Sequence, residues 1–270
     1  MKRDPRVRYP ITEGLFYPAE EEELKRKVDS LLLGDREASP ALIVPHASFD
    51  LVGEACGRAW QKCAKRPITK ILLISPIHGE AENYAALPPF HRFATPLGEI
   101  EADKKILEKL KDSSPLFRED IMPWEEEHAP ELSLPFAGRL FPDIRIIPIL
   151  TGNHRRKDIK EMGRVLGEVL RPYKDDLLTV ISTNLSRFIT PEVSQKEADN
   201  FVSIIEGKAL SEQQNREISA CGRNGLELFR EMGLYEGNFE EICRFEKEER
   251  ENRKSASLHY GSYRFVPARS

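Results

Sequence analysis

Short, mostly apolar stretches alternate with longer amphipathic stretches along this chain. The short stretches predict strands at residues 41–44, 70–75, 144–150 and 177–182, and the first two contain the continuous apolar runs 41–44 and 71–74, each ended by a nearby proline. Continuous runs of this kind, rich in β-branched residues, are typical of strands whose two faces are both covered by helices. The pattern therefore predicts an α/β protein, a layered sheet with helices on both faces.

The amphipathic stretches carry apolar residues at helical spacing. They predict helices at residues 19–33, 54–65, 103–111, 132–140, 158–170, 196–206 and 211–232. Asp103 is a suitable N-cap, and Ser211 with Gln214 forms a capping box. Because no linker interrupts the alternation, we expect a single domain over residues 1–270.

The C-terminal part has two contrasting patterns. Residues 239–253 combine a few apolar positions with a dense run of mixed charges, which predicts the solvated face of a helix. Residues 260–266 predict a final strand that returns to the main sheet.

Composition excludes several classes of protein. The chain has 270 residues, of which 40% are hydrophobic and 32% charged, as in ordinary soluble globular proteins. No stretch approaches the roughly 20 apolar residues of a membrane span, and the basic start leads into no apolar signal region. The net charge is −4, with 41 basic and 45 acidic residues interspersed. We therefore expect a cytoplasmic protein that binds neither nucleic acid nor membranes.

The cysteines are expected to be reduced thiols. There is no C-x-x-C pair and no secretory signal, so neither a disulfide scaffold nor a structural zinc site is predicted. Cys56 and Cys63 fall on a predicted helix and are expected to pack in the core.

Two histidines follow two of the predicted strands. His46 comes after the run at 41–44, and His78 after the run at 70–75. In open α/β sheets ligands bind at the carboxyl edge of the strands, so two imidazoles there can form half of a metal site. The alternative is that each is an ordinary loop or core histidine.

An acidic cluster with another histidine precedes the predicted helix at 132–140. Pro130 suits the first turn of a helix and nearby acids favour its N-terminus, so capping explains the cluster. Alternatively, Glu127, His128 and Glu131 project into the strand-end cleft, where one carboxylate hydrogen-bonds a ligating imidazole. Three further histidines lack such a setting and are expected at the surface or in loops: His91, His154 and His259.

Short motifs run in a fixed order from one end of the chain to the other. They are residues 8–18, Pro45-His46-Ala47, Ser75-Pro76-Ile77-His78, Thr95-Pro96-Leu97-Gly98, residues 127–131, residues 148–152, residues 182–188 and Cys221-Gly222-Arg223. In this order and spacing the chain resembles the Memo family, whose prokaryotic members are named AmmeMemoRadiSam system protein B.

The resemblance implies a fold like that of the class III extradiol dioxygenases (LigB-like), which use non-haem iron. It also implies a cleft lined by His46, His78, a third histidine and Cys221, a set proposed to bind metal. In this chain Asn184 replaces an aspartate of the family motif, and Arg187 replaces the third histidine. The family's prokaryotic name implies association with a radical-SAM protein and a further small protein partner.

These replacements change the expected chemistry. Arginine has no lone pair for a metal, and asparagine removes a negative charge, so a dication beside Arg187 would be repelled. The sequence therefore predicts a cleft with a degenerate non-haem metal site, lined by His46, His78, Asn184, Arg187 and Cys221. We expect such a cleft to bind a small anionic ligand, such as a carboxylate or phosphate, or a protein partner.

The alternative is a metal-dependent redox enzyme or dioxygenase-like oxidoreductase. Its metal ligands would be His46, His78 and Cys221, with Glu127 or His128 as acid or base, and this ligand set favours iron, copper or zinc. In either case Gly222 is expected to break the helix so that the Cys221 sulfur faces the cleft. Nearby arginines would then lower the pKa of that thiol, whereas an inert buried thiol is the competing interpretation.

Overall fold

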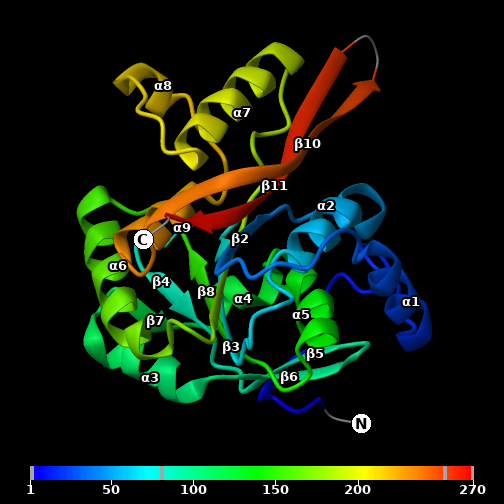
Figure 1. The fold of residues 1–270 in the computed structure, drawn as a ribbon, viewed down its shortest axis with the longest axis vertical. Coiled ribbons are helices and arrows are strands. Elements are labelled where there is room, and N and C mark those ends of the chain that lie inside the picture. The colour runs from blue at the N-terminus through cyan, green and yellow to red at the C-terminus, as the bar shows by residue number, and fades with distance from the viewer. Residues whose placement is uncertain (1–2, 80–81, 252–253, 269–270) are drawn as a thin grey trace.

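The centre of the sheet consists of parallel strands, seen in Figure 1 of the computed structural model, which describes residues 3–79, 82–251 and 254–268. Their spatial order is β6 (Gly98–Ala102), β8 (Arg145–Thr151), β3 (Lys70–Pro76), β9 (Leu177–Ser182) and β2 (Ala41–Val44). Four of them match the predicted strands. Because β9 lies between β2 and β3, the carboxyl ends of these three strands are neighbours at one edge of the sheet.

Shorter strands extend the sheet beyond β6 and β8. β5 (Arg92–Thr95) pairs antiparallel with β6, and β1 (Val7–Arg8) pairs parallel with β5. β4 (Ala85–Leu87) joins β8 on one side and β7 (Phe117–Glu119) on the other. At the opposite edge β11 (Lys254–Pro267) pairs with β2, and β10 (Gly237–Glu251) pairs with β11.

Helices cover both faces of the sheet, as predicted (Figure 1). One face carries α1 (Glu21–Leu31), α2 (Phe49–Gln61) and α5 (Leu134–Leu140), and the other carries α3 (Lys104–Ser113), α6 (Arg156–Leu170) and α9 (Arg223–Glu231). The remaining helical segments are α4 (Met122–Glu126), η1 (Glu131–Ser133), η2 (Arg171–Tyr173), α7 (Pro191–Ile205) and α8 (Glu212–Arg216). No helix among the described residues is long and apolar enough to span a membrane.

Two apolar clusters stabilise these layers. The larger packs the central strands against α1, α2, α5 and α6, and it contains Cys56 and Cys63 as buried free thiols, as expected. The smaller joins α7 and α9 to β2, β9 and the β10–β11 hairpin, with Phe201 and Tyr263 fully buried at its centre.

The segment predicted as a charged helix is a strand instead. β10 pairs with β11 along its length, which sets Phe239 opposite Phe265 and Phe245 opposite Tyr260. The ring centroids of these pairs lie 5.2 and 5.4 Å apart. Residues 246–249 are exposed, so they are solvated as expected, but the helix prediction was wrong because pairing with a distant strand outweighed the local charge pattern. Residues 252–253 of the predicted segment lie outside the described residues.

The single helix predicted at 211–232 is two helices, α8 and α9, joined by a loop that contains Cys221. The predicted capping box at Ser211 and Gln214 is present. Gly222 closely approaches the end of β9, where a Cβ atom would lie 2.3 Å from the Cβ of Thr183. The Gly222 N–H donates to Thr183 Oγ1 at 2.9 Å. The loop can therefore place Cys221 at the carboxyl edge of the sheet.

Candidate functional site

Two histidines and one cysteine meet at this edge of the sheet. His46 follows β2 and His78 follows β3, and their ring centroids are 5.0 Å apart. The Cys221 Sγ lies 3.5 Å from His46 Nε2. One potential ligand atom from each of the three residues lies within 4.8 Å of the other two. The structure thus brings together three residues that are far apart in the sequence.

Both imidazoles are held in place through Nδ1. His46 Nδ1 shares a 2.8 Å hydrogen bond with Ser182 Oγ at the end of β9, and the His46 backbone N–H donates to Asn184 Oδ1 at 3.3 Å. His78 Nδ1 lies 3.0 Å from the Glu127 carboxylate, which also accepts the His78 backbone N–H at 2.8 Å. Since Nδ1 of each ring is engaged, Nε2 is the nitrogen available to a ligand or metal.

Glu127 is almost completely buried, yet it remains ionised. Its carboxylate also accepts the backbone N–H of Ala129 at 2.8 Å. Burial alone would raise the pKa of Glu127, but the hydrogen bond and positive charge of His78 lower it below its usual value. The carboxylate therefore acts as the orienting partner of His78, the arrangement considered for this cluster from the sequence.

His128 supplies a third imidazole. Its ring stacks on His78 at a centroid distance of 5.4 Å and lies 6.0 Å from the His46 ring. The edge of Phe16, from the N-terminal motif, packs against it at 5.4 Å. Burial lowers the pKa of His128, so this imidazole is neutral near pH 7. Together with His78 and Glu127 it forms a second group whose atoms are close enough to share a cation.

Cys221 is partly buried among these groups. Burial alone would raise the pKa of its thiol, but the charge of His46 and hydrogen bonds with His46 and His78 lower it well below the usual value. The same hydrogen bond with Cys221, followed by that with Glu127, raises the pKa of His78 to about 10. The predicted lowering of the Cys221 pKa therefore has a different cause, since imidazoles rather than arginines produce it.

The arginines of this region have carboxylate partners. Arg187 donates to Glu197 Oε1 of α7 at 2.9 Å, and its side chain is 62% exposed. Among the described residues Arg187 makes no hydrogen bond or ion pair with His46, His78 or Cys221. Arg223 pairs with Glu227 at 3.1 Å.

Glu131 faces the N-terminal segment instead of the cluster. Its buried carboxylate pairs with Arg8 at 3.1 Å and accepts hydrogen bonds from the hydroxyls of Thr12 and Tyr17 at 2.6 and 2.7 Å. These contacts fix the segment that carries Phe16. Of the three acid–histidine candidates, Glu127 and His128 reach the site and Glu131 does not.

Two of the other histidines are more buried than expected. His259 was expected at the surface or in a loop, but it lies buried in β11, with Nδ1 2.9 Å from Ser194 Oγ and Nε2 3.0 Å from Gln195 Oε1. His154 lies in a loop, as expected, yet it is buried as well. Ser182 was not among the predicted site residues, although a polar residue that ends a mostly apolar strand at the ligand-binding edge was a usable signal.

Comparisons with known proteins agree with the family motifs. Residues 8–236 match the sequence profile of the family described as Memo-like protein. A MEMO1 family protein of Aquifex aeolicus is 30% identical over 206 residues, covering 74% of this chain and 75% of that protein. One from Caldivirga maquilingensis is 26% identical over 233 residues, covering 80% and 83%. A solved structure of an uncharacterized protein from Escherichia coli K12 has a TM-score of 0.46 and 15% identity, covering 83% of this chain and 99% of that one.

Proposed function

This chain belongs to the Memo-like protein family, and from that premise we propose that it is a metal-dependent redox enzyme whose metal is held by His46, His78 and Cys221. The observation that carries the proposal is the convergence of these three ligand types, with atoms within 4.8 Å of one another. Two imidazoles and a thiolate favour iron, copper or zinc over magnesium or calcium. Of iron, copper and zinc, only iron and copper change oxidation state in proteins, so the redox function requires one of these two.

The spacing and surroundings of the three residues fit a metal ion. The 3.5 Å between Cys221 Sγ and His46 Nε2 is close to the separation of two ligands at about 2.3 and 2.0 Å from one tetrahedral ion. Each imidazole already has the polar partner that orients a metal-binding histidine, Ser182 for His46 and Glu127 for His78. A cysteine with a strongly lowered pKa is ready to bind as thiolate.

The chain also supplies groups for handling protons. A bound iron or copper ion would provide the electron-transfer chemistry, and three protein ligands would leave a coordination position for a substrate. His128, neutral and stacked beside His78, is placed to accept a proton from a molecule at that position. Glu127, engaged with His78, keeps the His78 ring in position.

The pairing of Arg187 favours this function over anion binding at a degenerate metal site. From the sequence, the Arg187 guanidinium was expected to repel a dication and so to disfavour metal binding. That guanidinium pairs with Glu197, whose charge offsets it, and it is largely exposed to solvent, which screens its field. The loss of the family's third histidine is partly balanced by His128, which contributes another imidazole to the cluster.

Elemental analysis of protein purified without chelators tests the proposal. We expect close to one iron or copper per chain, lost in His46→Ala and in Cys221→Ser. His91→Ala, which removes a histidine outside the cluster, should keep the metal, and Arg187→His should change the content little. A wild-type protein that binds neither iron nor copper after reconstitution would refute the redox function. Zinc as the only metal bound would refute it as well.

A further inference from the structure

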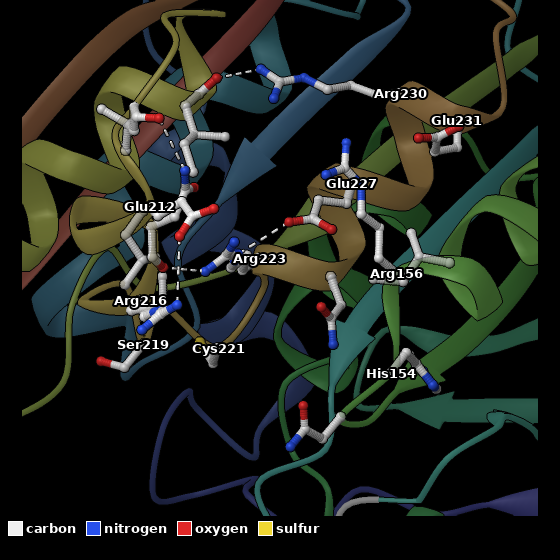
Figure 2. A pocket seen from close by; sticks show the side chains of 18 of the residues that line it. His154, Arg156, Glu212, Arg216, Ser219, Cys221, Arg223, Glu227, Arg230 and Glu231 are labelled. Atoms are coloured by element: carbon white, nitrogen blue, oxygen red, sulfur yellow. Dashed lines mark hydrogen bonds and ion pairs between the residues drawn. The ribbon is translucent and has the colours of Figure 1, made fainter.

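A cavity of about 920 Å³ adjoins the candidate metal centre. It lies between α8 with the following loop on one side and α6 with α9 on the other (Figure 2). Cys221 lines this cavity and also belongs to the histidine cluster. A molecule in the cavity would therefore lie beside Cys221, which is also one of the proposed metal ligands.

The cavity is rich in guanidinium groups. Figure 2 shows Arg156 extending from α6 and Arg223 from α9 into the same space. Arg156 has no hydrogen-bond or ion-pair partner among the described residues, and Arg230 donates only to backbone carbonyls. Glu227 offsets the charge of Arg223. The two remaining guanidinium charges have no carboxylate partner at salt-bridge distance.

Acidic residues of the lining leave this positive character in place. Glu212 pairs with Arg216 at 3.6 Å, as Glu227 does with Arg223. Glu231 is the remaining acid of the lining, and it has no hydrogen-bond or ion-pair partner among the described residues. Because Glu227 offsets Arg223, the excess of positive charge in the lining comes from Arg156 and Arg230, against the single carboxylate of Glu231.

The size and charge of the cavity indicate the class of its ligand. Pockets of about 300–1,000 Å³ hold small organic molecules. Guanidinium groups recognise the planar or tetrahedral oxygens of carboxylates and phosphates through paired hydrogen bonds. An organic molecule with one such group can bind the arginines while another part of it reaches Cys221.

We propose that this cavity is the substrate site, and that it binds a small organic oxyanion with its reacting part at Cys221. The unpaired guanidinium of Arg156 carries the binding, and Arg223, whose Nε and Nη1 are held by Glu227 and the Asn215 carbonyl, adds the N–H groups of Nη2. The proposal rests on the function proposed above, because it takes the centre at Cys221 as the place of reaction. It moves the anion site expected from the sequence, which was centred on Arg187, to the arginines of α6 and α9.

Alkylation with a matched pair of reagents tests the proposal. Iodoacetate and iodoacetamide both react when a thiolate displaces iodide, but only iodoacetate carries a carboxylate. In chelator-treated protein we expect the ratio of iodoacetate to iodoacetamide rates to be about tenfold higher at Cys221 than at Cys243, measured by peptide mass spectrometry. Inorganic phosphate and acetate, tested separately at constant ionic strength, should slow the alkylation of Cys221 by iodoacetate but not that of Cys243. The stronger competitor identifies whether the cavity prefers a phosphate or a carboxylate.

Matched variants locate the effect. Arg156→Gln should reduce the ratio of iodoacetate to iodoacetamide rates at Cys221 severalfold, because it removes a guanidinium that lines the cavity. Arg156 is exposed, so the substitution leaves the fold intact. Arg164→Gln on the same helix, where Arg164 pairs with Glu168 at the surface, should leave the ratio unchanged. Equal ratios at Cys221 and Cys243, or no difference between the two variants, would overturn the proposal.

The metal content separates this proposal from the function on which it rests. Arg156→Gln should bind as much metal as the wild type, because Arg156 lies outside the ligand cluster. A protein that binds no metal but keeps the reagent preference would refute the redox function and leave the oxyanion cavity. A protein that binds metal but shows no preference for iodoacetate at Cys221 would refute the oxyanion cavity and leave the redox function.

Discussion

Two small residues beside the candidate centre, Ser182 and Gly222, fix where its ligands lie. Ser182 holds the ring of His46, and Gly222 lets the loop carrying Cys221 pack against the end of β9. Neither is a ligand itself. Changes at these positions should therefore affect metal binding through the geometry of other residues.

Replacing Ser182 by alanine should weaken metal binding about 10- to 100-fold, the usual effect of removing the partner of a ligating histidine. The His46 ring would lose the hydrogen bond that fixes its Nδ1. A competition titration against a chelator measures the change. Ser203→Ala is a suitable control, since its exposed hydroxyl donates only to the backbone of its own helix. Unchanged affinity in Ser182→Ala would mean that His46 needs no such support.

Replacing Gly222 by alanine should destabilise the fold by about 1–3 kcal/mol, the usual cost of overpacking. The new methyl group would lie 2.3 Å from Thr183 Cβ and 2.6 Å from the carbonyl oxygen of Ser182. We also expect weaker metal binding, because relief of the clash moves Cys221. Urea unfolding gives the stability, and Gly138→Ala in α5, where a Cβ would make only an ordinary 3.4 Å contact, is the control. If the two variants are equally stable, the close approach at Gly222 does not constrain the loop.

Among the elements, η1 anchors the N-terminal segment to the body of the protein through Glu131. The carboxylate is 1% exposed and pairs with Arg8. Burial alone would raise the pKa of Glu131, but the hydrogen bond from the Thr12 hydroxyl and those from backbone N–H groups lower it. Because the segment carries Phe16, this anchor also shapes the wall beside His128.

Glu131→Gln should lower the free energy of unfolding at pH 7 by about 3 kcal/mol, because it leaves the buried Arg8 uncompensated. A carboxyl with a lowered folded pKa stabilises the fold above its unfolded value of about 4.5 and loses that effect as pH falls through the folded pKa. As the pH is lowered below about 5, the free energy of unfolding of the wild type should therefore decrease. That of Glu131→Gln should decrease less over the same pH interval. Urea unfolding at several pH values measures both. Parallel curves for the two proteins would show that other carboxyls govern acid unfolding.

The elements that could be predicted from sequence are those with a local signal. The runs at 41–44 and 71–74 are apolar throughout because both faces of each strand are buried, and this placed His46 and His78 at the correct strand ends. The strand β10 was missed because its partner lies in β11 and its charges resemble a solvated helix. The partners of Glu131 were beyond reach for the same reason, since Arg8 is 123 positions away in sequence. Contacts that depend on topology leave no local pattern.

At the scale of the whole molecule, the centre connects segments that the chain places far apart. Its three proposed ligands follow β2 and β3 and precede α9. A metal held by all three would therefore link the sheet to the α8–α9 region. Such a link couples metal binding to the stability of the whole fold.

Metal should stabilise the native protein by about 2.7 kcal/mol when its free concentration is 100 times the Kd. Urea unfolding of the loaded protein and of the chelator-treated protein measures the difference. The stability of His46→Ala should be insensitive to metal. An equal response of wild type and variant would show that the metal acts elsewhere on the protein.

The place of β9 between β2 and β3 has a consequence for how the protein is made. A ribosome delivers β2 and β3 early, but the strand that separates them in the sheet emerges only with residues 177–182. Until then His46 and His78 have no shared scaffold, and Cys221 is still to be synthesised. A nascent chain released before that point would hold no complete ligand set. Any metal bound by these three residues would therefore be acquired after nearly the whole chain has been translated, by a molecule whose non-local sheet pairing favours slow folding.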